Sequence, residues 1–283
     1  MKLARFDAGS GPRLGLIRGD FVVDLQDAGL SYPTMLDLIA AGPDALAQIR
    51  ALDPTLPSTP LDDVRLLAPI ERPGKYLAIG MNYQKHLEEA EKIGVAAPKQ
   101  QFWFNKQTSC IAGPYDAIDP GVTEKLDYEA ELGVVIGARA KSVTAADALS
   151  HVFGYLVAND VSARDWQFHS PTFTMGKSFD THGPIGPWIV TADEIPDPQS
   201  LDLRCFVNGK QRQSSNTRLM LHSIAKQIEY LSTAFTLEPG DLIASGTPEG
   251  VGVGMDPQVF LQAGDVVRCE IDGIGIIENR VAG

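Results

Sequence analysis

The sequence predicts an α+β, β-rich fold. A small N-terminal α/β domain comes first in the chain, and a roll or sandwich of mixed strands forms the main domain that follows it. Short apolar runs that end in Gly, Pro or Asn-Gly outnumber the amphipathic helical stretches. These runs do not alternate with helices as they do in a parallel-sheet fold. A stretch with three prolines, residues 53–60, has the composition of a linker. We therefore expect one domain over residues 1–65 and the main domain over residues 66–283, a length that allows a large core.

The N-terminal unit combines strand and helix patterns. Glycine-rich turns separate three expected strands, which are residues 2–6, 14–18 and 21–24. Thr34 has the position of an N-cap for a helix over residues 35–40, and Pro43 opens a second short helix over residues 45–52. No reactive side chains cluster here, so we expect this unit to have a structural role.

The main domain begins with an apolar strand over residues 75–80. Asn82 can cap a helix over residues 83–92, on which His86 and Glu89 are three residues apart and share a face. This short helix lies between Gly80 and Gly94 and could move as a lid.

The remaining elements are mostly strands. Asn208-Gly209 indicates a hairpin with a type I′ turn. Leu221, Ile224, Ile228 and Leu231 predict the apolar stripe of one helix. A further short helix is expected over residues 145–151, and strands over residues 127–137, 153–158, 188–190, 203–207, 210–213, 241–245, 266–271 and 274–280.

Composition excludes several classes of partner. A net charge of −12 argues against binding to nucleic acid or to an anionic membrane surface. The first residues have no signal-peptide apolar core, and no apolar run approaches membrane-spanning length. Cys110, Cys205 and Cys269 are odd in number and far apart, which favours reduced thiols. We expect a cytoplasmic protein with neither nucleic acid nor membrane as a partner.

Three carboxylates alternate along one expected strand. Asp127, Glu129 and Glu131 would lie on one face of the strand, where they repel one another. A hard cation such as Mg²⁺, Mn²⁺ or Ca²⁺ would remove the repulsion, since these ions take oxygen ligands. An acidic face exposed to water explains the spacing equally well. Asp160 ends a later apolar strand, where an ionised carboxylate is costly unless it is paired or bound to a metal.

Other candidate residues are individually ambiguous. Glu89 could orient His86 as a general base, although a surface histidine on an exposed helix fits the same spacing. Lys106 and Lys177 could each be a solvated lysine. Gly246 and Thr247 follow a strand, and either bring an amide and a hydroxyl close to a ligand or form a plain tight turn. The chain has no dinucleotide-binding, Walker or Gly-x-Ser-x-Gly motif.

Several motifs, taken together and in this order, resemble the fumarylacetoacetate hydrolase family. The resemblance is in particular to its branch of fumarylacetoacetate hydrolase domain-containing, acylpyruvate hydrolase-like proteins. The resemblance runs from about Leu77 to Val281. It is carried by GMNYQKHLEE at residues 80–89, FNK at 104–106, DYEAELG at 127–133, NDVSARD at 159–165, GKSFD at 176–180 and SGTPEGVG at 245–252.

The resemblance implies a β-roll catalytic domain, a homodimer, and Mg²⁺ or Mn²⁺ as cofactor, with Ca²⁺ as a further candidate. It implies Glu129, Glu131 and Asp160 as metal ligands and His86 with Glu89 as a lid dyad that activates water. The positions that would bind or polarise substrate are Lys106, Arg164, Gln167, Lys177, Gly246 and Thr247, with Lys177 also catalytic. Asp127 has no matching role and is expected to be solvated or to support the ligands.

Family substrates are small anionic 2-oxo acids, most of them with a 4-oxo group. The resemblance therefore implies metal-dependent hydrolysis of a C–C bond in 2,4-dioxo acids, of acylpyruvate or diketo sugar-acid type, through an enolate. The alternatives are a lyase or isomerase acting on oxaloacetate-like acids by decarboxylation or tautomerisation, a sugar-acid dehydratase, or a metal-dependent keto-acid binding protein. Met81 departs from the family pattern, because some acylpyruvate-hydrolysing members have Arg at this position. Without that positive charge, a doubly anionic substrate is less expected.

Overall fold

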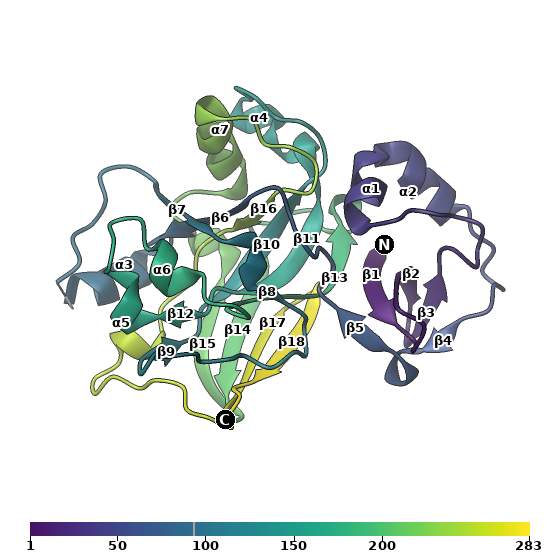
Figure 1. The fold of residues 1–283 in the computed structure, drawn as a ribbon. Coiled ribbons are helices and arrows are strands. Elements are labelled where there is room, and N and C mark those ends of the chain that lie inside the picture. The colour runs from purple at the N-terminus through teal and green to yellow at the C-terminus, as the bar shows by residue number, and fades with distance from the viewer. Residues whose placement is uncertain (93) are drawn as a thin grey trace.

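One twelve-stranded mixed sheet runs through the computed structural model, which describes residues 1–92 and 94–283 (Figure 1). Ten strands follow the order β4-β3-β2-β1-β13-β11-β10-β16-β6-β7, while β5 pairs with β1 and β8 with β13. Their bounds are β1 Lys2–Asp7, β2 Pro12–Arg18, β3 Phe21–Asp24, β4 Thr59–Pro60, β5 Arg65–Leu67, β6 Tyr76–Gly80, β7 Phe102–Lys106, β8 Ile111–Ala112, β10 Ala130–Ile136, β11 Val152–Asn159, β13 Gly183–Thr191 and β16 Leu242–Ala244.

A second sheet packs on the long one and makes the expected sandwich. It has the order β15-β14-β17-β18, with bounds β14 Asp202–Val207, β15 Lys210–Asn216, β17 Val266–Ile271 and β18 Gly275–Arg280. Leu132 and Val157 of the long sheet share one buried cluster with Leu203, Val267 and Ile277 of the second. The β-rich fold class is therefore confirmed. The hairpin turn is confirmed as well, because its two central residues both have positive φ, as a type I′ turn requires.

The N-terminal unit continues the main sheet. Strand β1 lies beside β13 (Figure 1) and pairs with it antiparallel, so that Lys2 is opposite Val190. The helices α1 (Met35–Ala40) and α2 (Gly42–Arg50) contribute Leu38 and Ile49 to a core cluster that also holds Ile189 of β13. Thr34 caps α1 as predicted. The expected linker ends in β4, which pairs with β3. The domain boundary at residue 65 stays a prediction.

Short elements frame one end of the long sheet. They are α3 (Gln84–Lys92), β9 (Leu126–Asp127), β12 (Ser162–Ala163), α5 (Arg164–Gln167), α6 (Thr174–Lys177) and the 3-10 turn η6 (Gly252–Gly254). The helices α4 (Ala145–Ala148) and α7 (Ile224–Ala234) lie together over another part of the sheet (Figure 1). The other 3-10 turns are η1 Leu61–Asp63, η2 Thr108–Cys110, η3 Leu149–His151, η4 Ala192–Glu194 and η5 Thr217–Leu219.

Three local predictions are wrong. The acidic run is not one strand, because Tyr128 and Glu129 lie between β9 and β10, and the Glu129 amide binds the Asn159 side chain instead of a backbone carbonyl. Asn82 does not cap α3, since its side chain bonds the backbone of His222 and the Ser245 carbonyl. Leu221 precedes α7, whose cap is Ser223, and is exposed.

Candidate active site

Three buried carboxylates meet at the end of the long sheet. One oxygen from each of Glu129, Glu131 and Asp160 lies within 4.8 Å of the other two. Antiparallel pairing of β10 with β11 sets Ala130 opposite Asn159, and this register brings Asp160 beside the two glutamates. The side chains are buried, so the alternative of an acidic face exposed to water is wrong.

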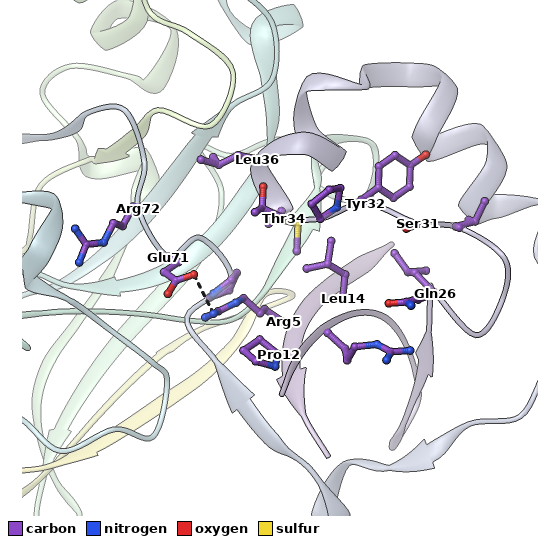
Figure 2. A pocket seen from close by; sticks show the side chains of 16 residues that line it. Arg5, Pro12, Leu14, Gln26, Ser31, Tyr32, Thr34, Leu36, Glu71 and Arg72 are labelled. Carbon is purple, nitrogen blue, oxygen red and sulfur yellow. Dashed lines mark hydrogen bonds and ion pairs between the residues drawn. The ribbon is translucent and has the colours of Figure 1, made fainter. Parts of the chain in front are cut away.

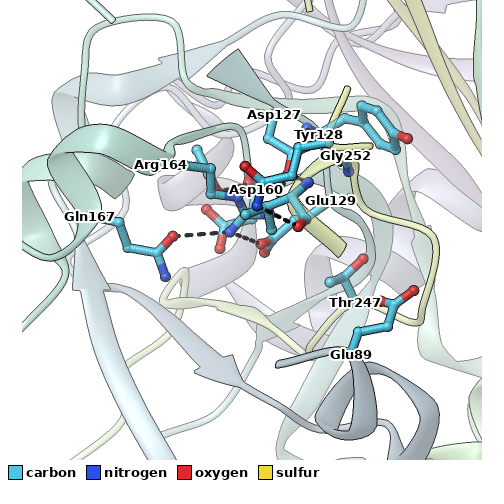
Figure 3. Close-up of polar contacts among 12 residues, drawn as sticks. Glu89, Asp127, Tyr128, Glu129, Asp160, Arg164, Gln167, Thr247 and Gly252 are labelled. Carbon is cyan, nitrogen blue, oxygen red and sulfur yellow. Dashed lines mark hydrogen bonds and ion pairs between the residues drawn. The ribbon is translucent and has the colours of Figure 1, made fainter. Parts of the chain in front are cut away.

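Lysine and arginine side chains neutralise the negative charge of two of these carboxylates, Glu129 and Asp160. Lys177 donates to Glu129 Oε2 and to Asp160 Oδ2, each over 2.8 Å. Arg164 lies 2.7 Å from Glu129 Oε1 (Figure 3). Burial alone would favour the neutral acid, but the charges of Lys177 and Arg164 outweigh it and hold the pKa of Glu129 well below its usual range.

Glu131 has no such partner. It accepts a hydrogen bond from the Gly246 amide, over 2.7 Å, and no lysine or arginine in the described part of the chain forms an ion pair with it. Burial, together with the negative charges of Asp160 and Glu129, raises the pKa of Glu131 well above its usual range. Glu131 is therefore the carboxylate that most requires a further cation.

Asp127 anchors the arginine. Its carboxylate accepts from Arg164 Nε over 2.9 Å and from the amides of Gly252 and Val253 over 2.8 and 2.9 Å. The expectation that Asp127 is solvated is wrong, whereas a role in supporting the ligands agrees with these contacts. Its place two residues before Glu129 indicates a position close to the cluster. Its contact with the loop at Gly252 and Val253 could not be predicted, because that loop is distant in sequence.

With Glu131 ionised, as a metal ligand would be, the carboxylate cluster and its partners carry one excess negative charge. Four buried carboxylates, Asp127, Glu129, Glu131 and Asp160, face three cations, which are Arg164, Lys177 and Lys106. An all-oxygen cluster with one uncompensated acid fits Mg²⁺ or Mn²⁺. Glu129, Glu131 and Asp160 are thus the residues that could hold a divalent ion.

Two residues that were predicted to contact substrate, Lys106 and Gly246, bind carboxylates of the cluster instead of lining the cavity. Lys106 contacts Asp160 at 2.5 Å, and the Gly246 amide is taken by Glu131. Gly246 has a φ of +100°, and a Cβ there would come within 2.6 Å of the Asn82 Cβ. Neither residue lines the cavity, and both hold carboxylates of the cluster in place; their contact with substrate stays a prediction.

The helix α3 brings the predicted dyad to the same cavity. His86 Nδ1 lies 3.4 Å from Glu89 Oε2, and Glu89 also accepts from the Gly250 amide over 3.0 Å. Their side chains are 13% and 19% exposed, which disagrees with a freely solvated surface histidine. Figure 3 shows Glu89 approaching from the side of Thr247, whose hydroxyl donates to the Ala130 carbonyl.

A cavity of about 70 Å³ lies between the dyad and Glu129 of the carboxylate cluster. Its polar and charged lining includes His86, Glu89, Glu129, Arg164, Gln167, Lys177 and Thr247. Its apolar lining includes Met81, Val95, Phe104, Phe168, Phe173 and Val251. The cavity therefore brings charged and apolar side chains together. The catalytic and binding roles of these residues remain predictions.

A second cavity, of about 380 Å³, lies on the N-terminal unit (Figure 2). Arg5 at its wall pairs with Glu71 over 3.0 Å, and Arg13 pairs with Asp24 and Asp27. In the described ranges, the only group of acids, histidines or cysteines that could hold a metal is the cluster at the first cavity. This contrast makes the first cavity the candidate active site.

Other predictions concern the thiols and the membrane. Cys110, Cys205 and Cys269 are buried and form no disulfide. Over residues 1–92 and 94–283, no helix has the length and apolar character needed to cross a membrane.

Comparison with known proteins decides the family. Residues 75–282 match the fumarylacetoacetate hydrolase C-terminal domain, and residues 1–69 match an N-terminal domain described as Rv2993c-like. The chain belongs to the fumarylacetoacetate hydrolase family. Among relatives of this family member, the mitochondrial oxaloacetate tautomerase FAHD2A of Bos taurus is 44% identical over 99% of this chain and 91% of its own.

Solved structures of family members agree with the fold. Fumarylacetoacetate hydrolase from Exiguobacterium antarcticum superposes with a TM-score of 0.88 at 39% identity, covering 100% of this chain and 99% of its own. Maleylpyruvate hydrolase from Sphingobium sp. SYK-6, solved with manganese(II) and pyruvate, has a TM-score of 0.84 at 34% identity, with the same coverage. The family thus includes hydrolases and a tautomerase.

Proposed function

We propose that this protein is a divalent-metal-dependent hydrolase that cleaves a C–C bond in 2,4-dioxo acids of acylpyruvate or diketo sugar-acid type. The observation that carries the proposal is one cavity whose lining includes both the histidine–carboxylate dyad and Glu129, a member of the buried three-carboxylate cluster. The manganese and pyruvate held by the maleylpyruvate hydrolase relative support the metal and the product class.

The proposed ligands are Glu129, Glu131 and Asp160, and Mg²⁺ or Mn²⁺ bound there would polarise the 2-oxo acid as a Lewis acid. Ca²⁺ also accepts an all-oxygen ligand set and is a further candidate. Lys106 and the Gly246 amide keep two of the three carboxylates in place. The substrate is a small anion, and the excess charge of a divalent ion is what would attract it to this acidic protein.

His86 is the proposed general base. Its Nδ1 faces Glu89, which leaves Nε2 to take a proton from water as the water oxygen attacks the C4 carbonyl. The C3–C4 bond then breaks, and its electron pair forms the enolate of a pyruvate-type acid. Lys177 stabilises the negative charge on that enolate. Return of the proton to C3 gives a 2-oxo acid and a carboxylic acid. Closure of α3 would bring His86 into place.

The second candidate is a tautomerase or decarboxylase of oxaloacetate-like acids. The 44% identity to an oxaloacetate tautomerase across nearly the whole chain favours it. This reaction needs only enolate formation and reprotonation, so the three carboxylates and Lys177 would suffice. His86 would then transfer a proton without activating water. A sugar-acid dehydratase would use the same enolate.

The variant His86→Ala separates the two candidates. We expect it to lose acylpyruvate hydrolysis by at least about 100-fold, the usual lower range for a general base, while enolate formation is retained. The assay is turnover of an acylpyruvate and of oxaloacetate with Mg²⁺ by purified wild type and variant. Hydrolysis by His86→Ala near the wild-type rate would contradict water activation. Turnover of oxaloacetate alone by the wild type would favour the tautomerase.

We further propose a cytoplasmic homodimer that binds neither nucleic acid nor membrane. The buried thiols without a disulfide support a reducing compartment, and the net charge of −12 disfavours both classes of polyanionic partner. Light scattering of the purified protein tests the dimer, since a monomeric mass would contradict it.

A further inference from the structure

The cavity has an apolar wall that the proposed chemistry does not use. Phe168 and Phe173, on the loop that links α5 to α6, lie with their ring centroids 5.2 Å apart. Phe173 also packs on Phe104 of β7, at 6.0 Å. Met81, Val95 and Val251 extend the apolar surface along the same cavity.

This wall begins at the reaction end. Lys177 Nζ, which bridges Glu129 and Asp160, lies 5.0 Å from the centre of the Phe104 ring. A 2-oxo acid whose enolate oxygen is stabilised by Lys177 would therefore extend its other end along Phe104 toward Phe173 and Phe168. Phe168 is 60% exposed, a large apolar surface left uncovered at the cavity.

The cavity offers no free cation for a second carboxylate. Among the described residues that line it, the lysine and arginine side chains are Lys177 and Arg164. Lys177 is held by Glu129 and Asp160, and Arg164 by Asp127 and Glu129. Burying a carboxylate against the phenylalanine wall would leave it without a charged partner, which is unfavourable.

The charge balance leads to the same conclusion. With Glu131 ionised as a ligand, the four carboxylates at the cluster exceed their three cationic partners by one, so a divalent ion would leave a single positive charge there. One carboxylate of the substrate neutralises that charge. A second carboxylate would restore a net negative charge inside a buried site.

We propose that the apolar wall binds an uncharged, apolar tail of the substrate, so that this enzyme acts on monocarboxylic rather than dicarboxylic 2-oxo acids. The inference rests on the proposed function, because it takes the carboxylate cluster as the end that binds the 2-oxo acid. Phe168 and Phe173 are then specificity-determining residues that contact the tail.

The test is calorimetric binding of two six-carbon acids to the Mg²⁺-loaded protein. 2-Oxohexanoate ends in a methyl group and 2-oxoadipate in a carboxylate, and neither has a 4-oxo group that could be hydrolysed. We expect 2-oxohexanoate to bind at least about tenfold more tightly, since only its tail avoids burial of an unpaired charge. Phe168→Arg should reduce this ratio at least threefold by supplying a cation. Phe21→Arg, at an exposed phenylalanine of β3, is the matched control and should leave the ratio unchanged.

Each other outcome has a definite meaning. Equal affinities, or tighter binding of 2-oxoadipate, would overturn the inference and leave the proposed function intact. Failure of both acids to bind would overturn the inference through the proposed function itself. A ratio unchanged by Phe168→Arg would overturn the assignment of the tail to the phenylalanine wall.

Discussion

Lys177 Nζ donates a hydrogen bond to Asp160 Oδ2 over 2.8 Å, and both side chains are buried. The same ammonium bonds Glu129, so one lysine compensates two of the three proposed metal ligands. Burial opposes its charge, yet the carboxylates of Asp160 and Glu129 raise the pKa of Lys177 above its usual value. It is therefore a fixed positive charge next to the carboxylate cluster.

Replacement of this lysine should affect both stability and turnover. Lys177→Met leaves two buried carboxylates with fewer partners, and we expect the metal-free protein to lose about 3 kcal/mol of unfolding free energy. Turnover with Mg²⁺ should fall by at least about 100-fold, because a charge that stabilises the enolate is lost. Denaturant unfolding and steady-state kinetics measure the two effects. Lys210→Met, at an exposed lysine of β15, is the control, and equal behaviour of the two variants would contradict the assignment.

Glu89 should act through His86. Glu89→Gln keeps the size of the side chain but removes the charge that orients the imidazole and accepts from the Gly250 amide. We expect kcat for C–C hydrolysis to fall by about 10- to 100-fold with a smaller change in KM. Glu88→Gln, one residue earlier on α3, is a matched control because Glu88 is exposed and accepts a hydrogen bond from Gln84 on the same helix. A loss of equal size in both variants would indicate a general effect on the helix.

Glu131 should give the metal-free protein a pH dependence of a defined sign. The pKa of Glu131 is raised in the folded state, so above its ordinary value of about 4.3 the folded chain holds a proton that the unfolded chain releases. Stability of the chelated protein should therefore fall as pH rises through this window, by at most about 1.4 kcal/mol per pH unit from this group.

The variant Glu131→Gln tests that sign, because it removes the titrating group and should flatten the slope. Added Mg²⁺ should raise the melting temperature of the wild type and have little effect on Glu131→Gln, because the variant lacks a proposed ligand. Thermal unfolding from pH 5 to 8 measures both effects, with Glu238→Gln, at an exposed acid, as control. An identical slope in wild type and Glu131→Gln would show that Glu131 is ionised without a metal.

Gly176 should be required for the position of Lys177. A Cβ at residue 176 would come within 2.3 Å of the Gln167 Cα and 2.6 Å of the Ala163 carbonyl oxygen. Gly176→Ala must push α6 away from α5, and we expect a loss of about 1–3 kcal/mol in stability together with reduced turnover. Met175→Ala, at a side chain that is largely exposed, should change neither. Wild-type stability and activity of Gly176→Ala would contradict this packing argument.

The sequence predicted the strand-rich sandwich because its short apolar runs and turn residues are local signals. Asp160 was found as a candidate because a carboxylate at the end of an apolar strand is unusual on energetic grounds alone. The register that brings it beside Glu129 depends on pairing between β10 and β11, which no local pattern specifies.

The errors have the same origin. Asn82 has the position of a helix cap, but its amide serves contacts to His222 and Ser245 that are distant in sequence. The spacing alone does not predict the structural role of Asp127, because its partners Arg164 and Gly252 come together only in the folded chain. Residues whose function depends on such long-range contacts are those for which spacing gave the least information.

The central claim is that the carboxylate cluster supports metal-dependent formation of a 2-oxo-acid enolate, the step that both proposed reactions share. The most direct measurement is exchange of the C3 hydrogens of 2-oxobutyrate for deuterium in D₂O, followed by NMR. We expect exchange well above the buffer rate with Mg²⁺ or Mn²⁺, its loss on chelation, and its recovery when the metal is restored. Absence of exchange with either metal, or exchange that survives chelation, would contradict metal-dependent enolate formation at this cluster.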